Sequence, residues 1–250
     1  MKSLQKVINI LELFLSNDED LSLSDLAKFS GLHKTTVYRI VSLLVGQGYL
    51  KQREKRGKYS LGMKFLDFSG AIKKRMKIRE IALPYLEKLS KSLKETILLQ
   101  IWDGKESVLA ETIHSDYVLQ AIPNEGTKVP LHSSAGGKVF LAHMTEEGLK
   151  KYCNERGLKA LTPNTITDLN ELKKQLLIVK RECIGFDYEE TLLGASGVGS
   201  GIKDAQGNIA AIVNILGPTV RLSRARLKEI APEIKSCALE ISRELGWKGR

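Results

Sequence analysis

The chain has 250 residues and a formal net charge of +10, with 42% hydrophobic and 27% charged residues. That length and apolar content suffice for two domains with hydrophobic cores. The sequence contains no run of about eighteen apolar residues, and its start lacks the apolar region of a secretion signal, so we expect no membrane partner. Cys153, Cys183 and Cys237 are isolated, which disfavours disulfides and metal clusters and indicates a reducing cytoplasm.

The positive charge is concentrated in the first third of the chain. Residues 1–80 contain 16 Lys and Arg against 8 Asp and Glu, whereas residues 81–250 contain 23 against 21. A strongly basic segment followed by a nearly neutral one favours a polyanionic partner for the first segment.

The first two predicted helices are short and amphipathic. The first has apolar residues at helical spacing: Leu4, Val7, Ile8, Leu11 and Leu15. We expect the second to open at Ser24-Asp25 with a Ser cap, and to bury Leu26 and Ala27. Gly31 then supplies a turn.

A third helix is predicted over 34–46. Its apolar stripe is Val37, Ile40, Val41 and Leu44, which leaves Lys34, Thr35, Tyr38, Arg39 and Ser42 on the outer side. We expect Thr35 or Thr36 to cap the helix, where the positive end of the helix dipole suits a phosphate. Gly46 and Gly48 end it.

A basic hairpin is predicted over 49–61, because Lys51, Arg53, Lys55, Arg56 and Lys58 are opposed only by Glu54. On its own such a hairpin is often merely solvated, but beside an amphipathic helix of this kind it favours phosphate contact. The succession predicts a winged helix-turn-helix that binds double-stranded operator DNA. The expected DNA contacts are Ser24, His33, Lys34, Thr35, Thr36, Tyr38, Arg39, Arg53, Lys55, Arg56 and Lys58.

The next segment is strongly helical and separates two predicted domains. We expect a DNA-binding domain over 1–62, a linker helix over 63–79 and a second domain over 80–250. Pro84 should kink the path or start a new helix. The basic run between Lys73 and Arg79 either contacts DNA alongside the linker or only keeps the linker soluble.

The remainder alternates between strand and helix patterns. Strands are predicted over 96–102, 107–113, 117–122, 185–190, 198–203 and 209–216, and helices over 134–144, 145–156, 168–183 and 223–246. This order predicts an α/β domain with a mostly antiparallel sheet, and an α+β protein overall.

The whole chain resembles the IclR family of transcriptional regulators. The segments that carry the resemblance are GLHKTTVYRIVSLLVGQGYL, REIALPYLEKL, VPLHSSAGGKVFLAHM, GFDYEETLLGASGVGSGIKDAQGNIAAIVNILGP and the final helix. The resemblance implies a winged helix-turn-helix, a linker helix and a GAF-like domain that binds a small effector, an organic or aromatic acid. It also implies homodimers or homotetramers.

The resemblance further implies which residues form the effector cleft. They are Val118, Ala121, Val129, Ser134, Ala135, Gly136, Asp187, Ala195, Gly197, Asn214 and Leu216. Two positions depart from the family pattern, since the stretch Gly194 to Gly197 lacks the family's cysteine and Gly201 replaces a proline. We expect the glycines to loosen or open that strand, so that the pocket takes a different effector or is degenerate.

Enzymatic motifs are weak by comparison. The stretch 134–139 is not a P-loop and 197–201 lacks the order of a nucleophile elbow. We expect Glu189 and Glu190 at a pocket edge and solvated rim, Lys138 either in the cleft or on a helix surface, and the four histidines at surface or turn positions. The sequence thus predicts an effector-controlled repressor without cofactor, metal or catalytic site. The alternatives are a metabolite-binding or metabolite-processing enzyme domain tethered to a DNA-binding head, and a regulator with a collapsed pocket.

Overall fold

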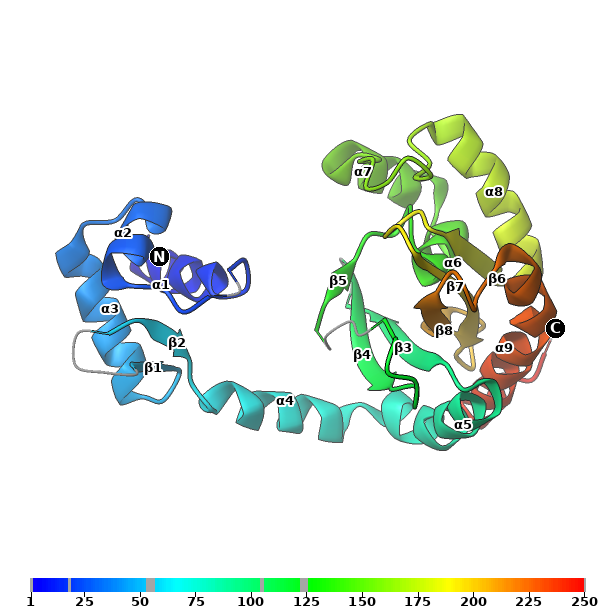
Figure 1. The fold of residues 1–250 in the computed structure, drawn as a ribbon, viewed down its shortest axis with the longest axis horizontal. Helices are drawn as coiled ribbons and strands as arrows, with labels where there is room; N and C mark the ends of the chain where they lie inside the picture. Colours follow the sequence, from blue (N-terminus) through cyan, green and yellow to red (C-terminus); the bar gives the residue numbers. More distant parts are fainter. Residues whose placement is uncertain (1, 18, 53–56, 104–105, 122–125, 250) are drawn as a thin grey trace. The chain divides into compact units, whose positions relative to one another are not determined.

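The computed structural model describes residues 2–17, 19–52, 57–103, 106–121 and 126–249 (Figure 1). The chain divides into two compact units, Met1–Arg75 and Met76–Arg250. Among the described residues, no helix is long and apolar enough to cross a membrane.

The first unit has the predicted three helices and hairpin. It contains α1 (Lys2–Leu13), α2 (Leu23–Ser30), α3 (Lys34–Gly46), β1 (Leu50–Gln52), β2 (Tyr59–Leu61) and α4 (Lys64–Arg75). The two strands pair antiparallel, with Leu50 opposite Leu61. Val37, Val41 and Leu44 of α3 are buried in the core of this unit, as their spacing predicts.

The predicted stripe of α1 is wrong in part. Leu4, Ile8 and Leu15 are exposed, and Ile10 and Phe14 are buried instead. Apolar residues lie on several sides of this helix, and its spacing alone does not say which side meets α2.

Two predicted helix caps are also wrong. The cap of α2 is Ser22 and not Ser24, because Ser22 and Asp25 bond reciprocally: the Ser22 N–H donates to Asp25 Oδ2 at 2.9 Å, and the Asp25 N–H donates to Ser22 Oγ at 3.2 Å. Helix α3 begins after His33, whose side chain makes no capping bond, so Thr35 and Thr36 lie inside the helix. The predicted Gly31 turn is confirmed by its φ of 67°.

The helical segment after the hairpin breaks at Met76 rather than at Pro84. Helix α4 ends at Arg75, and Met76 has ψ of 80°, outside the helical range. Helix α5 (Lys77–Leu93) then continues through Pro84. The apolar residues of α4 are not buried, although Phe65 and Phe68 contact the ring of Tyr49.

The second unit is built on a six-stranded antiparallel sheet, which confirms the predicted sheet type. Its strands are β3 (Thr96–Trp102), β4 (Ser107–Ile113), β5 (Lys128–Val129), β6 (Ile184–Tyr188), β7 (Ala195–Lys203) and β8 (Ile209–Pro218), in the order β5-β4-β3-β8-β7-β6. The strand predicted over 117–122 is wrong for residues 117–121, which are irregular, and Ile122 lies outside the described residues. The two-residue strand β5 occupies that sheet edge instead.

Helices cover both faces of this sheet (Figure 1). Helix α5 and helix α9 (Arg224–Glu244) pack on one face with the side chains of Ile97, Val198 and Ile215. Helix α6 (Ala135–His143), helix α7 (Glu146–Arg156) and helix α8 (Leu169–Glu182) form a second core, and α6 packs directly on β6, β7 and β8.

The glycines of β7 do not loosen the strand, contrary to expectation. Strand β7 pairs with β8 along its length, with one irregularity near Lys203. A Cβ at Gly199 would lie 3.3 Å from the Gly136 nitrogen of α6, and one at Gly201 would lie 3.2 Å from Val139 Cγ1 of α6. The glycines therefore give α6 the space to approach the sheet closely.

Candidate functional site

The first candidate site is the outer face of α3. Lys34, Thr35, Tyr38 and Arg39 are all exposed, with 57% of Tyr38 accessible, whereas Thr36 is half-buried. Thr35, Tyr38, Arg39 and Ser42 follow the i, i+3, i+4 and i+7 spacing, so they share one face. The His33 side chain makes no capping bond. The Thr36 N–H donates to the His33 carbonyl oxygen at 2.9 Å, so the N–H groups of Lys34 and Thr35 are the ones of the first turn that can bind an anion such as phosphate.

The hairpin contributes exposed basic residues beside this helix in the chain. Lys51 and Lys58 are exposed, and Lys58 Nζ lies 3.6 Å from Glu19 Oε2 in a solvated ion pair that contributes little to stability. The predicted contacts Arg53, Lys55 and Arg56 lie outside the described residues. Ser24 is exposed on α2.

The second candidate site is a cavity of about 350 Å³ in the second unit. It opens between the sheet face that carries α6 and the segment around β5. Seven of the predicted effector residues line it: Ala121, Val129, Ser134, Asp187, Ala195, Asn214 and Leu216. They come from β5, β6, β7, β8, the α6 cap and the 117–121 segment.

Four other predicted effector residues do not line this cavity. Val118 is fully exposed at 104% because the irregular 117–121 segment turns it outward. Ala135 and Gly136 are buried in the first turn of α6, against β6 and Gln100. A Cβ at Gly197 would lie 2.5 Å from the Ile215 carbonyl oxygen. Gly197 therefore lies against the backbone of β8 and leaves no room there for a side chain.

Asp187 brings an acid into the cavity wall. Its Oδ1 accepts hydrogen bonds from the Glu190 N–H at 2.7 Å and the Thr191 N–H at 3.4 Å. Burial raises the pKa of Asp187, while hydrogen bonds and the charge of Lys138 oppose the shift. The carboxyl therefore favours its neutral form more than an exposed aspartate does, and in that form it can donate a hydrogen bond.

Lys138 and Glu190 form a buried ion pair behind this wall. Lys138 is 1% exposed, and its Nζ donates to Glu190 Oε1 and to the Phe186 carbonyl at 2.9 Å. Burial raises the pKa of Glu190 despite the neighbouring ammonium. The expectations of a solvated Glu190 and a surface Lys138 are wrong, because the loop after β6 folds back over α6.

Comparison with known proteins identifies the chain. The family model of the IclR helix-turn-helix domain matches residues 3–54, and that of the bacterial transcriptional regulator IclR C-terminal domain matches residues 70–243. The chain belongs to the IclR family. It is a DNA-binding transcription regulator with a C-terminal effector domain. The matching proteins are regulators and not enzymes.

Full-length relatives share this architecture. The HTH-type transcriptional regulator KipR of Bacillus subtilis is 30% identical over 98% of both chains. The solved IclR structure from Thermotoga maritima has a TM-score of 0.79 and 31% identity, covering 99% of this chain and all of that one. An IclR homologue from Microbacterium hydrocarbonoxydans, solved with 4-hydroxybenzoate, has the same fold, with a TM-score of 0.83 and 24% identity over 97% of this chain and 98% of that one.

The cavity of about 350 Å³ also contains polar residues that sequence reasoning missed. Gln100 is 1% exposed and Asn214 is 5% exposed, and the side-chain oxygens of both amides, Gln100 Oε1 and Asn214 Oδ1, have no hydrogen-bond partner among the described residues. Thr191 adds a hydroxyl whose Oγ1 donates to Ser133 Oγ at 3.1 Å. The one available signal for Gln100 was a lone amide within the apolar stretch TILLQIW.

Proposed function

We propose that this regulator represses transcription by binding operator DNA through α3 and through the wing, the basic hairpin predicted over residues 49–61. We further propose that a small organic acid in the cavity of about 350 Å³ controls this binding. The observation that carries the proposal is the pair of buried amides in the cavity, Gln100 and Asn214, whose oxygens find no partner in the described part of the chain. A buried polar group without a partner costs free energy, so such groups commonly await a ligand or an ordered water.

The chemistry of the cavity favours an acid that also carries a hydroxyl group. Either amide can turn its NH₂ group toward a ligand carboxylate, because the oxygen and nitrogen of an amide are interchangeable by a flip. Asp187 lies on β6, two strands from Asn214 on β8, and it can donate a hydrogen bond to a ligand hydroxyl group when protonated or accept one when charged. The Microbacterium hydrocarbonoxydans homologue was solved with 4-hydroxybenzoate, an acid of this kind.

For the DNA complex, we infer that two winged heads of a dimer occupy successive major-groove half-sites. Thr35, Thr36, Tyr38 and Arg39 then lie nearest the base edges. Ser24, His33, Lys34, Arg53, Lys55, Arg56 and Lys58 then contact phosphates, which position the head without reading sequence. The dimer or a pair of dimers works in the cytoplasm, where the operator is.

Control by the effector requires two arrangements of the protein that bind operator differently. An effector that binds these arrangements with different affinity shifts their populations and so changes operator affinity. Repression is the simplest outcome, because occupancy of a promoter excludes RNA polymerase without any further contact.

A ligand screen on the full chain tests the proposal. Organic, sugar and aromatic acids are screened by thermal shift, since a ligand at a hundred times its dissociation constant stabilises the protein by about 2.7 kcal/mol. We expect Asn214→Leu to remove the shift and Gln206→Leu, on an exposed turn, to keep it. The hit should change operator affinity in a gel-shift titration and be recovered chemically unchanged. A hit that is converted, or that leaves operator affinity unchanged, contradicts effector control.

A further inference from the structure

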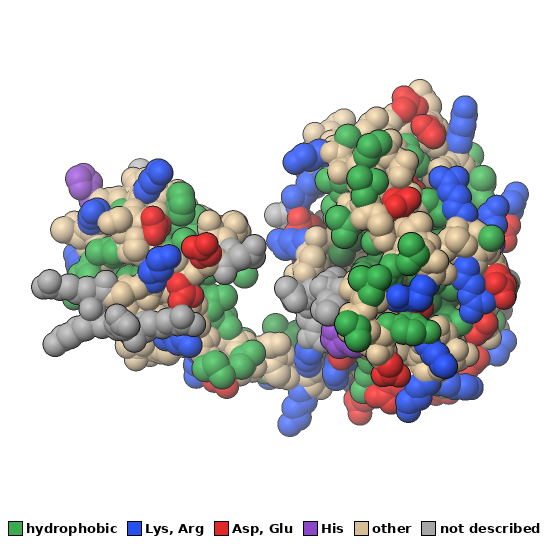
Figure 2. Space-filling view, viewed as in Figure 1, with side chains coloured by type: hydrophobic (Ala, Val, Ile, Leu, Met, Phe, Trp, Pro, Cys, Tyr) green, Lys and Arg blue, Asp and Glu red, His purple; other side chains and the backbone are tan. Residues whose placement is uncertain are grey.

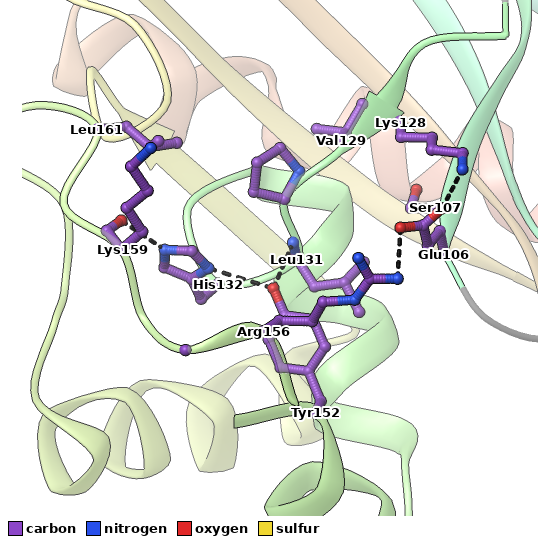
Figure 3. A pocket seen from close by; sticks show the side chains of 12 residues that line it. Glu106, Ser107, Lys128, Val129, Leu131, His132, Tyr152, Arg156, Lys159 and Leu161 are labelled. Atoms are coloured by element: carbon purple, nitrogen blue, oxygen red, sulfur yellow. Dashed lines mark hydrogen bonds and ion pairs between the residues drawn. The ribbon is translucent and has the colours of Figure 1, made fainter. Parts of the chain in front are cut away.

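A second cavity, of about 240 Å³, lies beside the β4–β5 edge of the sheet (Figure 3). It is enclosed by this edge, by the end of α7 and by the segment that follows α7. Its charged and polar lining residues are Glu106, Ser107, Lys128, His132, Tyr152, Arg156 and Lys159. Of these residues, only Lys128 also lines the first cavity.

Cations outnumber acids around this cavity. Lys128 Nζ lies 2.6 Å from Glu106 Oε2, and Arg156 Nη2 lies 2.6 Å from Glu106 Oε1, so two cations converge on one carboxylate (Figure 3). Lys159 adds a third cation to the lining. The Asp103 carboxylate also acts on Lys128, and even with it the cations outnumber the acids by one. Since the planar guanidinium has five N–H donors, it can bind a second acid alongside Glu106.

A buried hydroxyl group in the lining lacks a partner. Ser107 is 0% exposed, and its Oγ makes no hydrogen bond to any described residue. A serine hydroxyl in this state is a ready donor for the oxygen of an incoming ligand.

The wall opposite is held in place by hydrogen bonds. The Leu131 N–H donates to the Tyr152 hydroxyl at 3.0 Å, and that hydroxyl lies 3.2 Å from His132 Nδ1. His132 Nε2 lies 3.0 Å from the Lys159 carbonyl (Figure 3). His132 is buried by these contacts and lies in a turn, which is one of the two positions expected for it. The cavity is thus formed before any ligand enters it.

The two cavities share one wall. Lys128, Val129 and Pro130 line both of them. The Pro130 carbonyl accepts from Ser134 Oγ at 2.7 Å, and Ser134 Oγ in turn accepts from the Gly137 N–H as the cap of α6. A ligand that displaces the Lys128 to Pro130 segment therefore acts directly on the first cavity and on the cap of α6.

We propose that the second cavity is a regulatory site for a small organic anion, with a carboxylate as the recognised group, and that its occupancy changes the affinity of the first cavity for its effector. Anion binding to the second cavity does not depend on the function proposed above. The effect of the anion on effector affinity rests on that proposed function.

Calorimetric titration of the full chain with acetate, succinate and citrate tests the binding. We expect Arg156→Gln to weaken binding by about tenfold or more, as for a lost charge-assisted hydrogen bond, and Ser107→Ala to weaken it severalfold. The matched control is Arg226→Gln on α9, because Arg226 is as exposed as Arg156 and also pairs with a glutamate, Glu229, at 2.8 Å. Thermal melts verify that each variant is folded.

The outcomes separate this site from the other places where an anion can bind. Loss of binding with Arg156→Gln and Ser107→Ala but not with Arg226→Gln supports the proposal. No binding by the wild type, equal loss with both arginine variants, or loss only with Asn214→Leu overturns it, the last because the anion then occupies the first cavity.

Coupling is measured with the effector found by the ligand screen. We expect a saturating concentration of the anion to change its dissociation constant severalfold in the wild type and not in Arg156→Gln. If the anion binds but the dissociation constant of the effector in the wild type does not change, the coupling is refuted. The proposed effector function is then unaffected.

Discussion

At the scale of single residues, Asp187 is an acid in surroundings that disfavour its charge. Its pKa is raised above the ordinary value of 3.8, chiefly by burial. Because the folded protein then binds the proton more tightly than the unfolded chain, this carboxyl contributes stability at low pH. That contribution is lost as the pH rises through the folded-state pKa.

Asp187→Asn should therefore stabilise the protein without ligand at neutral pH. Asparagine keeps an oxygen that accepts from the Glu190 and Thr191 N–H groups, but it cannot take the buried charge. We expect a higher melting temperature at pH 7 than in the wild type, and a smaller fall in stability as the pH rises above about 4. Because the pKa of Glu190 is also raised, part of the loss of stability with rising pH should remain in both proteins. If the stability of the wild type and of Asp187→Asn changed equally with pH, the raised pKa of Asp187 would be refuted.

Arg39 tests base reading at the same scale. It is exposed on α3 beside Tyr38, and its guanidinium can bond a guanine edge. Arg39→Ala should weaken binding to the operator by about 1–3 kcal/mol, with a smaller effect on a scrambled duplex. Gel-shift titrations of both duplexes measure the difference, and an equal loss on both would mean that Arg39 contacts only phosphate.

At the scale of elements, glycines in β6 and β7 let α6 pack closely on the sheet beside the first cavity. A Cβ at Gly185 would overlap the Ala135 carbonyl oxygen, which belongs to a helix backbone and cannot turn aside. A Cβ at Gly201 would meet Ile209 Cδ1 at 2.7 Å and Cys183 Sγ at 2.9 Å, which are the ends of side chains. An added methyl group at Gly185 would thus press on the backbone of α6, whereas one at Gly201 would meet side chains that can move aside.

Gly185→Ala should accordingly cost more stability than Gly201→Ala. Overpacking against a fixed backbone typically costs about 1–3 kcal/mol, and we expect Gly185→Ala in that range with Gly201→Ala below it. Urea denaturation followed by circular dichroism gives both values. Equal losses of stability would show that the whole helix α6 can move away from the sheet. The contact between Gly185 and the Ala135 carbonyl oxygen would then not fix its position.

The sequence predicts these elements better than it predicts their surroundings. Strands β3 and β4 have the predicted bounds, because alternation and turn residues are local signals. The caps of α2 and α3 were misplaced, since several adjacent residues could each serve as a cap. The burial of Lys138 and the place of Gln100 in the cavity depend on elements distant in the chain, which no local pattern encodes.

At the scale of the whole molecule, the two units differ in charge. Acidic and basic side chains are interspersed on the visible face of the second unit (Figure 2), in keeping with its nearly balanced composition. The excess of Lys and Arg lies in the first 80 residues. Attraction to DNA should therefore come from the first unit and be sensitive to salt.

The wing variant Lys55→Ala with Arg56→Ala should weaken binding to every duplex alike. Each lost phosphate contact lowers the slope of log affinity against log salt by about 0.9, so the double variant should lower it by about 2. Binding titrations at four salt concentrations give the slope, with Lys150→Ala and Lys151→Ala on α7 as the charge-matched control. An unchanged slope would exclude contact between these side chains and phosphate.

Gln100 and Asn214 lie on β3 and β8, the two strands at the centre of the sheet. Central strands are among the last parts of a domain to open. If the proposed effector binds these two amides, they hold it from the most stable part of the domain. Exchange of either side chain should then alter ligand preference without unfolding the sheet.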